Sequence, residues 1–398
     1  MTLKRLILLF PFVLMLACSK EALIADHEAD TRILMPSVEN YTDSFTEKKD
    51  WDAATKWLFA MQGPSGLLES SENSNFVSLY DNALAAIYFI HLGEKERAER
   101  IFDLFHSKMQ TELMTAPKGF YQFRDREGHN GSRTWMGDNA WLLLALNHYE
   151  NVYGTTKYAA MQMELDTWLR SLQDVDGGLF GGLNEDGSTI PKVTEGIITA
   201  FRAVRGYDGF HQKLLTYLFA ERWDEQQQIL LSWPENEPYK LALDNQTLGS
   251  VIFDGFTTDL LQKAHRFKTV QELTLTGESI EGYCFDEDLD VVWLEGTAQM
   301  AVALQTAQNH EAANSILKQL EKAFILSSTH AGTHGLPYAS NHGTGYGKDP
   351  LWDHADLAPA LSATLWYRFA KEGLNPLGQN DGKEIPTADQ FWLPVLSN

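Results

Sequence analysis

The 398-residue sequence has little cysteine, and this excludes a fold held together by disulfides. It contains two cysteines, Cys18 and Cys284. Because Cys18 ends an apolar leader, Cys284 has no second cysteine in the mature chain with which to form an internal bridge. We interpret Cys284 as a buried structural thiol, since free cysteines are among the most buried residue types. The fold must therefore rely on an apolar core.

Basic residues are also scarce relative to acids. The chain carries 32 Lys and Arg against 54 Asp and Glu, which gives a formal net charge of −22. Such a surface repels phosphate backbones and other polyanions, so the composition argues against DNA, RNA and acidic glycans as partners. Aromatic residues, in contrast, make up 12% of the chain and include 11 Trp. Their faces can stack on sugar rings, although a large helical core also uses many of them.

The sequence lacks the common motifs for metals and nucleotides. The Gly-rich segment 176–182 has no phosphate-binding Lys, and the His-rich segment 330–342 has neither an HExxH pattern nor paired cysteines. The acidic segment 286–290 lacks the central Gly of an EF-hand loop, so whether it binds calcium stays open. We expect neither a metal nor a cofactor at the functional site.

The N-terminus contains a short, strongly apolar run. Lys4 and Arg5 precede a short apolar stretch that ends in Met15-Leu16-Ala17-Cys18. The stretch is too short for a membrane span and is typical of a secretory signal. Its last four residues resemble a bacterial lipobox, which implies cleavage before Cys18 and lipid attachment there. An ordinary signal peptide with an incidental cysteine is the alternative.

The leader also suggests a location and a division of the chain. Because Ser19 and not Asp follows the cysteine, we expect a lipid-anchored protein of the cell envelope. The expected site is the outer membrane of a Gram-negative bacterium, on its periplasmic or surface face. We divide the chain into a signal peptide (1–18), a tether (19–47) and one domain (48–398).

A short phrase, an acid followed by a small-residue-rich apolar helix, recurs along this domain. The recurring acids are spaced by 49 to 58 residues: Asp81, Asp138, Glu195, Asp244, Glu295 and Asp353. A period of this size fits two helices and two loops, and such repeats indicate a closed or stacked helical architecture. Each apolar helix is hydrophobic nearly all round, which is typical of a buried helix, and is followed by an amphipathic one.

The alternation predicts an all-α (α/α)6 toroid of six inner and six outer helices. We expect the inner helices at 81–92, 138–153, 194–205, 244–254, 295–307 and 355–371. We expect the outer helices at 48–61, 95–109, 156–172, 209–222, 257–267 and 310–324. Repeat-built toroids bury one continuous core, so a single domain of this length is reasonable. The inner helices would run in the same direction and place all six acids around one mouth.

Helix capping is a purely structural explanation for these acids, because Asp caps helix N-termini well. It suits Asp81 and Asp244 best. Glu is a poor cap, so Glu195 and Glu295 need another reason, although Thr194 could cap the helix that contains Glu195. Gly directly follows both glutamates and weakens the helix start, which suggests close approach of a ligand or another backbone.

Paired carboxylates across a cleft are what cleavage of a glycosidic bond requires. We expect the catalytic carboxyls to be Asp138, Glu195 and Glu295, with Glu295 as general acid and Asp138 or Glu195 as base. Further substrate contacts are expected from Tyr80, Asp81, Tyr121, Arg124, Trp135, Asn139, Trp141, Asp244, Trp293, Tyr338, Trp352 and Asp353. The aromatic members of this set would form a platform for sugar rings.

The helix openings resemble those of the six-hairpin glycosidase superfamily. The similarity rests on Tyr80-Asp81-Asn82-Ala83-Leu84, Gly137-Asp138-Asn139-Ala140-Trp141 and 293–299, with 176–178 between them, and spans about residues 48–375. It implies the (α/α)6 fold and an acid-lined cleft acting on carbohydrate. The adjacent Asp-Asp pair of α-1,6-mannanase-like members is absent. Residues 80–83 are similar to the opening of unsaturated glucuronyl hydrolases, but the rest of the chain does not follow that family. Linkage, anomer and mechanism stay open.

The sequence therefore predicts an extracytoplasmic, lipid-anchored glycoside hydrolase acting on a neutral poly- or oligosaccharide. A non-catalytic glycan-binding lipoprotein is one alternative. A polysaccharide lyase is another, for which Tyr121, Arg124 and Tyr338 would supply the base and the uronate partner. A toroid that binds an apolar isoprenoid is a third alternative, but it would need a less polar central cavity than these acids allow. The oligomeric state stays open.

Overall fold

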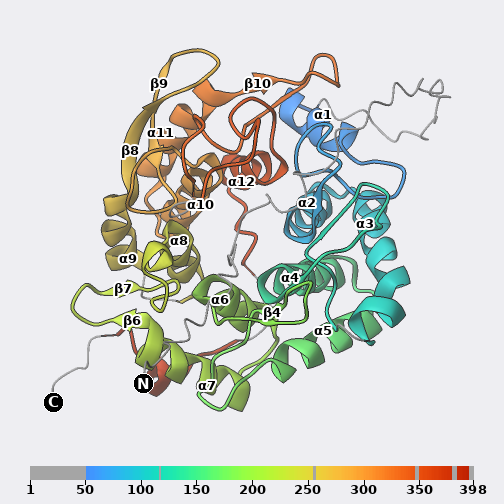
Figure 1. Ribbon diagram of the computed structural model, residues 1–398, viewed down its shortest axis with the longest axis vertical. Helices are drawn as coiled ribbons and strands as arrows, with labels where there is room; N and C mark the ends of the chain where they lie inside the picture. Colours follow the sequence, from blue (N-terminus) through green and yellow to red (C-terminus); the bar gives the residue numbers. More distant parts are fainter. Residues whose placement is uncertain (1–50, 116–117, 254–256, 346–348, 379–382, 394–398) are drawn as a thin grey trace, which may run out of the picture.

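The computed structural model describes residues 51–115, 118–253, 257–345, 349–378 and 383–393. Within these ranges the chain forms twelve α-helices arranged as two concentric rings (Figure 1). The leader, Cys18 and the tether lie outside the described residues. Among the described helices, none combines the length and hydropathy needed to cross a bilayer. The predicted (α/α)6 toroid is confirmed.

The inner ring contains every second helix of the chain from α2 onward. Its members are α2 (Leu79–Leu92), α4 (Met136–Tyr153), α6 (Thr194–Ala203), α8 (Leu243–Ile252), α10 (Leu294–Thr306) and α12 (Leu361–Glu372). Each inner helix packs against the next, and α12 packs back against α2, which closes the ring. The inner helices are buried along almost their whole length, as their continuous apolar sequence indicates.

The outer ring covers the inner one with amphipathic helices. Its members are α1 (Ala53–Ala60), α3 (Lys95–Lys108), α5 (Ala159–Ser171), α7 (Gly209–Tyr217), α9 (Thr257–Lys263) and α11 (His310–Leu320). In α3 the apolar side chains Ala98, Ile101, Phe102 and Phe105 face the core. Short turns of other helix types extend several outer helices: η2 (Met109–Leu113), η3 (Leu218–Arg222), η5 (Ala264–Phe267) and η6 (Glu321–Ala323). These turns explain why the expected outer helices reach further than the α-helical cores.

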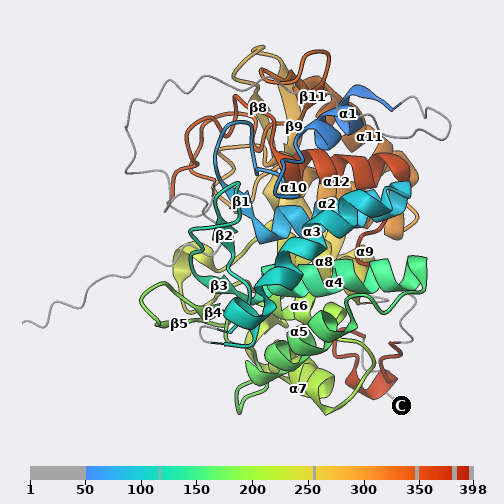
Figure 2. The same ribbon diagram turned by 90° about the vertical axis from the view of Figure 1, so that its right-hand side faces the viewer.

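Five small antiparallel sheets join the helices in the part of the chain that the structure describes. The strands are β1 (Val77–Ser78) with β2 (Phe123–Arg124), β3 (Thr134–Trp135) with β4 (Gly182–Leu183) and β5 (Thr189–Ile190), β6 (Trp223–Asp224) with β7 (Ile229–Leu230), β8 (Lys268–Glu272) with β9 (Ser279–Tyr283), and β10 (Ile325–Leu326) with β11 (His334–Gly335). In β1 and β2 the register pairs Val77 with Arg124 and Ser78 with Phe123. Seen from the side, β1 to β5 gather at the end where the inner helices begin (Figure 2).

A recurring side-chain clamp fixes these strands to the inner helices. The fourth residue of five inner helices is polar and buried: Asn82, Asn139, Gln246, Thr297 and Thr364. Asn139 shows the pattern, since its amide bonds both the N–H and the C=O of Phe120 and also the C=O of Trp135. Each clamp therefore satisfies buried backbone groups that would otherwise lack partners. Helix α6 has Ile197 at this position and lacks the clamp.

The start of the last inner helix differs from the expectation. Helix α12 begins at Leu361, not near residue 355, and Pro359 lies in the loop before it. Asp353 therefore lies in that loop, where its side chain is exposed. Ser362 occupies the second helical position, which Glu195, Asp244 and Glu295 occupy in the three preceding inner helices. Five acids, not six, stand at the starts of the inner helices.

Candidate active site

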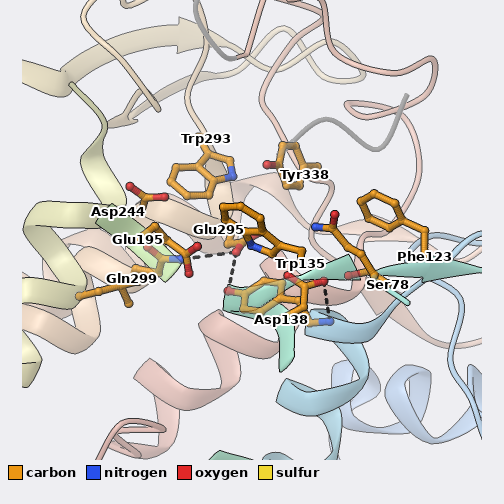
Figure 3. Close-up of a pocket in the computed structure, with 13 residues that line it drawn as sticks. Ser78, Phe123, Trp135, Asp138, Glu195, Asp244, Trp293, Glu295, Gln299 and Tyr338 are labelled. Carbon is orange, nitrogen blue, oxygen red and sulfur yellow. Dashed lines mark hydrogen bonds between the residues drawn. The ribbon is translucent and has the colours of Figure 1, made fainter. Parts of the chain in front are cut away.

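A pocket of about 600 Å³ opens among the N-termini of the inner helices (Figure 3). Its lining residues are Ser78, Tyr80, Gln122, Phe123, Trp135, Asp138, Glu195, Asp244, Leu248, Trp293, Glu295, Gln299 and Tyr338. The pocket lies at the mouth that the repeat predicts.

Four carboxyl groups reach the pocket from the first turns of consecutive inner helices. They are Asp138 on α4, Glu195 on α6, Asp244 on α8 and Glu295 on α10. Because these helices are neighbours in a ring of common direction, their first turns meet at one mouth. Asp138, Asp244 and Glu295 are 6%, 5% and 4% exposed, and Glu195 is half-buried. The structure thus brings together the three expected catalytic acids and one expected substrate contact.

Hydrogen bonds hold Glu295 in one orientation. The Tyr80 hydroxyl donates to Glu295 Oε1 over 2.8 Å, and Gln299 Nε2 contacts the same oxygen at 3.4 Å. Both donors are themselves oriented. The Trp366 indole N–H donates to the Tyr80 hydroxyl over 2.6 Å, and the Thr247 hydroxyl donates to Gln299 Oε1 over 3.1 Å. Donors fixed in this way stabilise the ionised form of a carboxylate.

Tyr80 also contacts the acid on the neighbouring helix. Its backbone N–H donates to Asp138 Oδ2 over 3.3 Å. Burial raises the pKa of the Tyr80 phenol well above its usual range, and the charge of Glu295 raises it further. The phenol therefore stays protonated and remains a donor to Glu295. Tyr80 links the α4 and α10 sides of the pocket.

The other three acids share a different electrostatic environment. Burial raises the pKa of Glu195 to about 7, a rise that the Thr199 hydroxyl and the Trp141 indole oppose and the charge of Glu295 supports. Burial raises the pKa of Asp138 well above its usual range, and the Glu195 carboxyl adds to this rise. Burial and the same Glu195 carboxyl raise the pKa of Asp244. Burial therefore favours the protonated form of these three carboxyls, whereas the donors Tyr80 and Gln299 favour the ionised form of Glu295.

Aromatic side chains wall the pocket. Trp293 and Tyr338 lie on one side of Glu295, and Phe123 lies on another (Figure 3). The ring centroids of Trp293 and Tyr338 are 6.2 Å apart, and those of Tyr338 and Trp352 are 4.4 Å apart. Trp352 does not line the pocket but packs behind Tyr338. Trp135 lines the pocket as expected.

Several residues expected to contact substrate lie behind the pocket lining. Asp81, Asn139 and Trp141 are buried and are not among the lining residues. Ser78, not Asp81, caps α2, because its hydroxyl accepts the N–H of Asp81. Asn139 serves the backbone clamp instead of facing the pocket. Trp141 packs edge-on against Tyr80 with ring centroids 5.5 Å apart.

Tyr121, Arg124 and Asp353 lie elsewhere, and the expectation that they face the pocket is wrong. The guanidinium of Arg124 forms a buried ion pair with Glu112 of η2 at 2.9 Å. The ring of Tyr121 packs over Gly131, where an added Cβ would lie 2.2 Å from the ring. Sequence alone could not show that Arg124 turns toward the outer helices, because its partner Glu112 belongs to no recognisable motif.

The glycines beside the two glutamates have an internal explanation. A Cβ on Gly296 would lie 2.0 Å from the Trp293 ring, and one on Gly196 would lie 2.8 Å from the Met136 methyl group. A Cβ on Gly137 would lie 2.9 Å from Glu195 Oε2. These glycines let side chains and helices α4 and α6 approach closely, so packing within the protein accounts for them. Thr194 is not the cap of α6, since its hydroxyl bonds the carbonyls of Leu231 and Ser232.

Sequence reasoning missed five lining residues: Ser78, Gln122, Phe123, Leu248 and Gln299. Gln299 follows Glu295 by one helical turn, and this i,i+4 spacing could have identified it. Leu248 stands in the same relation to Asp244. Gln122 and Phe123 come from the strand segment that pairs with β1, and no local pattern marks them as pocket residues.

One cluster of possible metal-binding side chains lies away from the pocket. Within the described ranges, Cys284, Asp288 and Asp290 form the one group whose ligand atoms lie within 4.8 Å of each other. Cys284 is fully buried, as expected, and its thiol contacts Asp288 at 3.5 Å. Thr344 donates to both aspartates. These contacts account for the cluster as a tie between two loops.

Comparison of the sequence with protein-family models and with curated proteins finds no match. Solved structures, however, resemble the fold. A wild-type glycosidase shares 12% identity over 82% of this chain and 96% of its own, with a TM-score of 0.54. A glycosidase variant in complex with glucose shares 11% identity over the same proportions, with a TM-score of 0.51. A sugar epimerase from a ruminal bacterium shares 11% identity over 81% and 97%, with a TM-score of 0.55.

The chain shares their fold. The toroid, and not any particular activity, is what these similarities establish at such low identity.

Proposed function

We propose that the protein is a glycoside hydrolase that acts on a neutral oligo- or polysaccharide. The observation that carries the proposal is the pocket in which Glu295 is held by donors while Glu195 has a raised pKa. Cleavage of a glycosidic bond needs one carboxyl of each kind. The glycosidases of similar fold, one with glucose bound, support a sugar as the ligand.

The geometry favours the reverse of the roles expected from sequence. Glu295, with its two donors, suits the ionised carboxylate that activates water or attacks the anomeric carbon. Glu195, with a pKa of about 7, suits the acid that protonates the leaving oxygen, because a catalytic acid works best when its pKa is near the operating pH. Asp138, on α4, accepts a hydrogen bond from the Tyr80 N–H.

Two alternatives lose support from the pocket. A lyase would need a cation for a uronate carboxylate, but Arg124 is paired with Glu112 and Tyr121 does not line the pocket. An isoprenoid binder would not place four carboxyls in its cavity.

A sugar epimerase is the second candidate, because one neighbour of similar fold carries that activity.

A product screen separates these functions. The purified chain from Ser19 onward is incubated with neutral and acidic oligosaccharides and with monosaccharides, and products are resolved by chromatography and mass spectrometry. Hydrolysis adds one water per bond broken, whereas epimerisation leaves the mass unchanged. We expect hydrolysis of a neutral oligosaccharide, lost in Glu295→Gln. Mass-neutral conversion would favour the epimerase, and binding without turnover would favour a glycan-binding protein.

The envelope location is a separate part of the proposal. The lipobox-like sequence ending at Cys18 supports lipid anchoring of the mature chain. We expect wild-type protein in the membrane fraction and Cys18→Ala in the soluble fraction of a Gram-negative host. Equal partitioning of the two proteins would contradict the anchor.

A further inference from the structure

Asp244 has no part in the proposed proton transfers. Asp244, in the first turn of α8, lines the pocket and is 5% exposed. Its Oδ1 has no hydrogen-bond partner. Leaving a buried carboxyl oxygen unpaired costs about 1–3 kcal/mol or more, so folded proteins rarely do so without a reason. A ligand hydroxyl in the pocket would supply the missing partner.

A second unpaired polar group lines the same pocket. The Trp293 indole Nε1 is buried and also lacks a partner. The ring cannot turn freely, because it lies against Gly296 and packs edge-on against Phe285 with centroids 4.9 Å apart. The pocket thus presents a fixed donor at Trp293 and an open carboxyl oxygen at Asp244. Sugar hydroxyls both donate and accept, and they match this pair.

The pocket ends inside the molecule. Beneath Tyr80 the rings of Trp141 and Trp366 meet edge-on with centroids 5.9 Å apart, and both are 1% exposed. At the opposite end of the inner ring, the chain after α12 packs across α4 and α6. His148 bonds the carbonyl of Pro376, and Arg202 bonds that of Leu377. A glycan can therefore enter from the mouth but cannot pass through the toroid.

Building on the proposed hydrolase, we propose that the pocket receives one terminal sugar residue of a neutral glycan and that Asp244 determines its specificity. Asp244 and Trp293 bind ring hydroxyls of this residue. The glycosidic C–O bond next to it breaks, water supplies a proton and a hydroxyl, and one monosaccharide is released per turnover. The enzyme is exo-acting, because a pocket that is closed at its inner end by Trp141 and Trp366 does not accommodate the middle of a chain.

The product pattern tests the exo action. A neutral hexasaccharide that the screen shows to be cleaved, labelled at its reducing end with 2-aminobenzamide, is sampled before 10% conversion. We expect a monosaccharide and a chain shortened by one residue as the first products. Internal fragments at the earliest times would overturn the inference while leaving the hydrolase standing. Absence of hydrolysis of every glycan would overturn the hydrolase and this inference with it.

Deoxy sugars test the role of Asp244. Monodeoxy analogues of the released monosaccharide are compared as competitive inhibitors of wild type, Asp244→Asn, Asp244→Ala and Asp353→Asn. Because the pKa of Asp244 is raised, its hydrogen bond to a sugar hydroxyl is one between neutral groups, worth about 0.5–1.5 kcal/mol, so we expect one or two analogues to bind wild type about 2- to 10-fold more weakly than the parent sugar. Asp244→Ala should lose this discrimination, and Asp353→Asn, an exposed acid outside the pocket, should keep it.

Two controls keep the test decisive. Thermal unfolding of each variant shows whether it is folded, and the isosteric Asp244→Asn covers the case in which the alanine variant is unstable. If both Asp244 variants retain the wild-type discrimination among deoxy analogues, Asp244 does not bind substrate and the specificity role is overturned.

Discussion

At Glu295, two neighbouring side chains donate hydrogen bonds that favour the ionised form of the carboxyl. Tyr80 donates to Glu295 Oε1 and is itself oriented by the Trp366 indole. Gln299 reaches the same oxygen and is oriented by Thr247. Fixed donors of this kind need no reorganisation during the reaction, which is how preorganised sites stabilise charge. The chemistry of the pocket therefore depends on residues that need not touch substrate.

Tyr80→Phe tests this dependence. Removing the hydroxyl deletes one donor to Glu295, so the ionised form becomes less stable and activity should be lost at a higher pH on acidification. We expect kcat to fall about 10- to 100-fold, with little change in KM. The measurement is a pH–rate profile of kcat. Tyr217→Phe, on outer helix α7, is the control, and a profile unchanged in Tyr80→Phe would contradict the positioning role.

The raised pKa of Glu195 also has a consequence for stability. The pKa is about 7 in the folded protein and near 4.3 in an unfolded chain. Between these values the folded state binds the proton and the unfolded state does not. The free energy of unfolding should therefore fall as pH rises from about 4.5 to 7, by up to about 3 kcal/mol from this group.

Glu195→Gln removes that contribution. Urea unfolding at pH 5 and pH 7.5 should show a smaller loss of stability in the variant than in wild type over this interval. Asp138 and Asp244 remain in both proteins, but the Glu195 carboxyl contributes to their raised pKa values, so the difference measures Glu195 together with its coupling to these two acids. An equal loss in the two proteins would show that Glu195 titrates as an ordinary exposed acid.

At the scale of elements, polar contacts between helices and loops keep the mouth in shape. The buried pair of Arg124 on β2 and Glu112 on η2 ties the strand beside Phe123 to the end of an outer helix. The Asn139 amide does the same for the backbone of Phe120. Arg124 and Asn139 therefore affect the pocket indirectly, by fixing the backbone beside Phe123 and Phe120.

Arg124→Met should therefore change stability and not substrate affinity. Breaking a buried ion pair leaves the Glu112 charge uncompensated, and we expect a loss of about 3–5 kcal/mol. Adding Glu112→Leu should restore much of that loss, because neither charge is then buried alone. Denaturant unfolding measures both effects, and KM of the folded variants should stay near the wild-type value. A KM increase with no loss of stability would return Arg124 to the substrate site.

The boundaries of the helices show which parts of the fold can be predicted from the sequence and which cannot. The recurring acids and apolar runs predicted all six hairpins. Gly93, Gly154 and Gly373 end α2, α4 and α12 in the left-handed conformation, as Gly often does after the last helical residue. The repeat predicts Asp353 at a helix start, and this prediction is wrong because the residue lies in the loop before α12. Its spacing fitted the period, but α12 begins at Leu361, after Pro359.

At the scale of the whole molecule, the toroid turns a one-dimensional repeat into a single pocket. Acids about 50 residues apart in sequence meet because neighbouring inner helices start at the same face. This meeting could be predicted from periodicity alone. Which side chains turn inward could not, because that depends on partners such as Glu112 for Arg124 and Phe120 for Asn139. The formal charge of −22 fits the proposed neutral substrate.

The measurement that tests the central claim most directly compares two substrates of the sugar released in the screen, its natural glycoside and its glycosyl fluoride. Fluoride leaves without a proton, so it needs no general acid. We expect Glu195→Gln to lose about 10²- to 10⁴-fold on the glycoside but to retain most activity on the fluoride, and Glu295→Gln to lose both. Equal losses on the two substrates in Glu195→Gln, or full activity in Glu295→Gln, would contradict the assignment of acid and carboxylate.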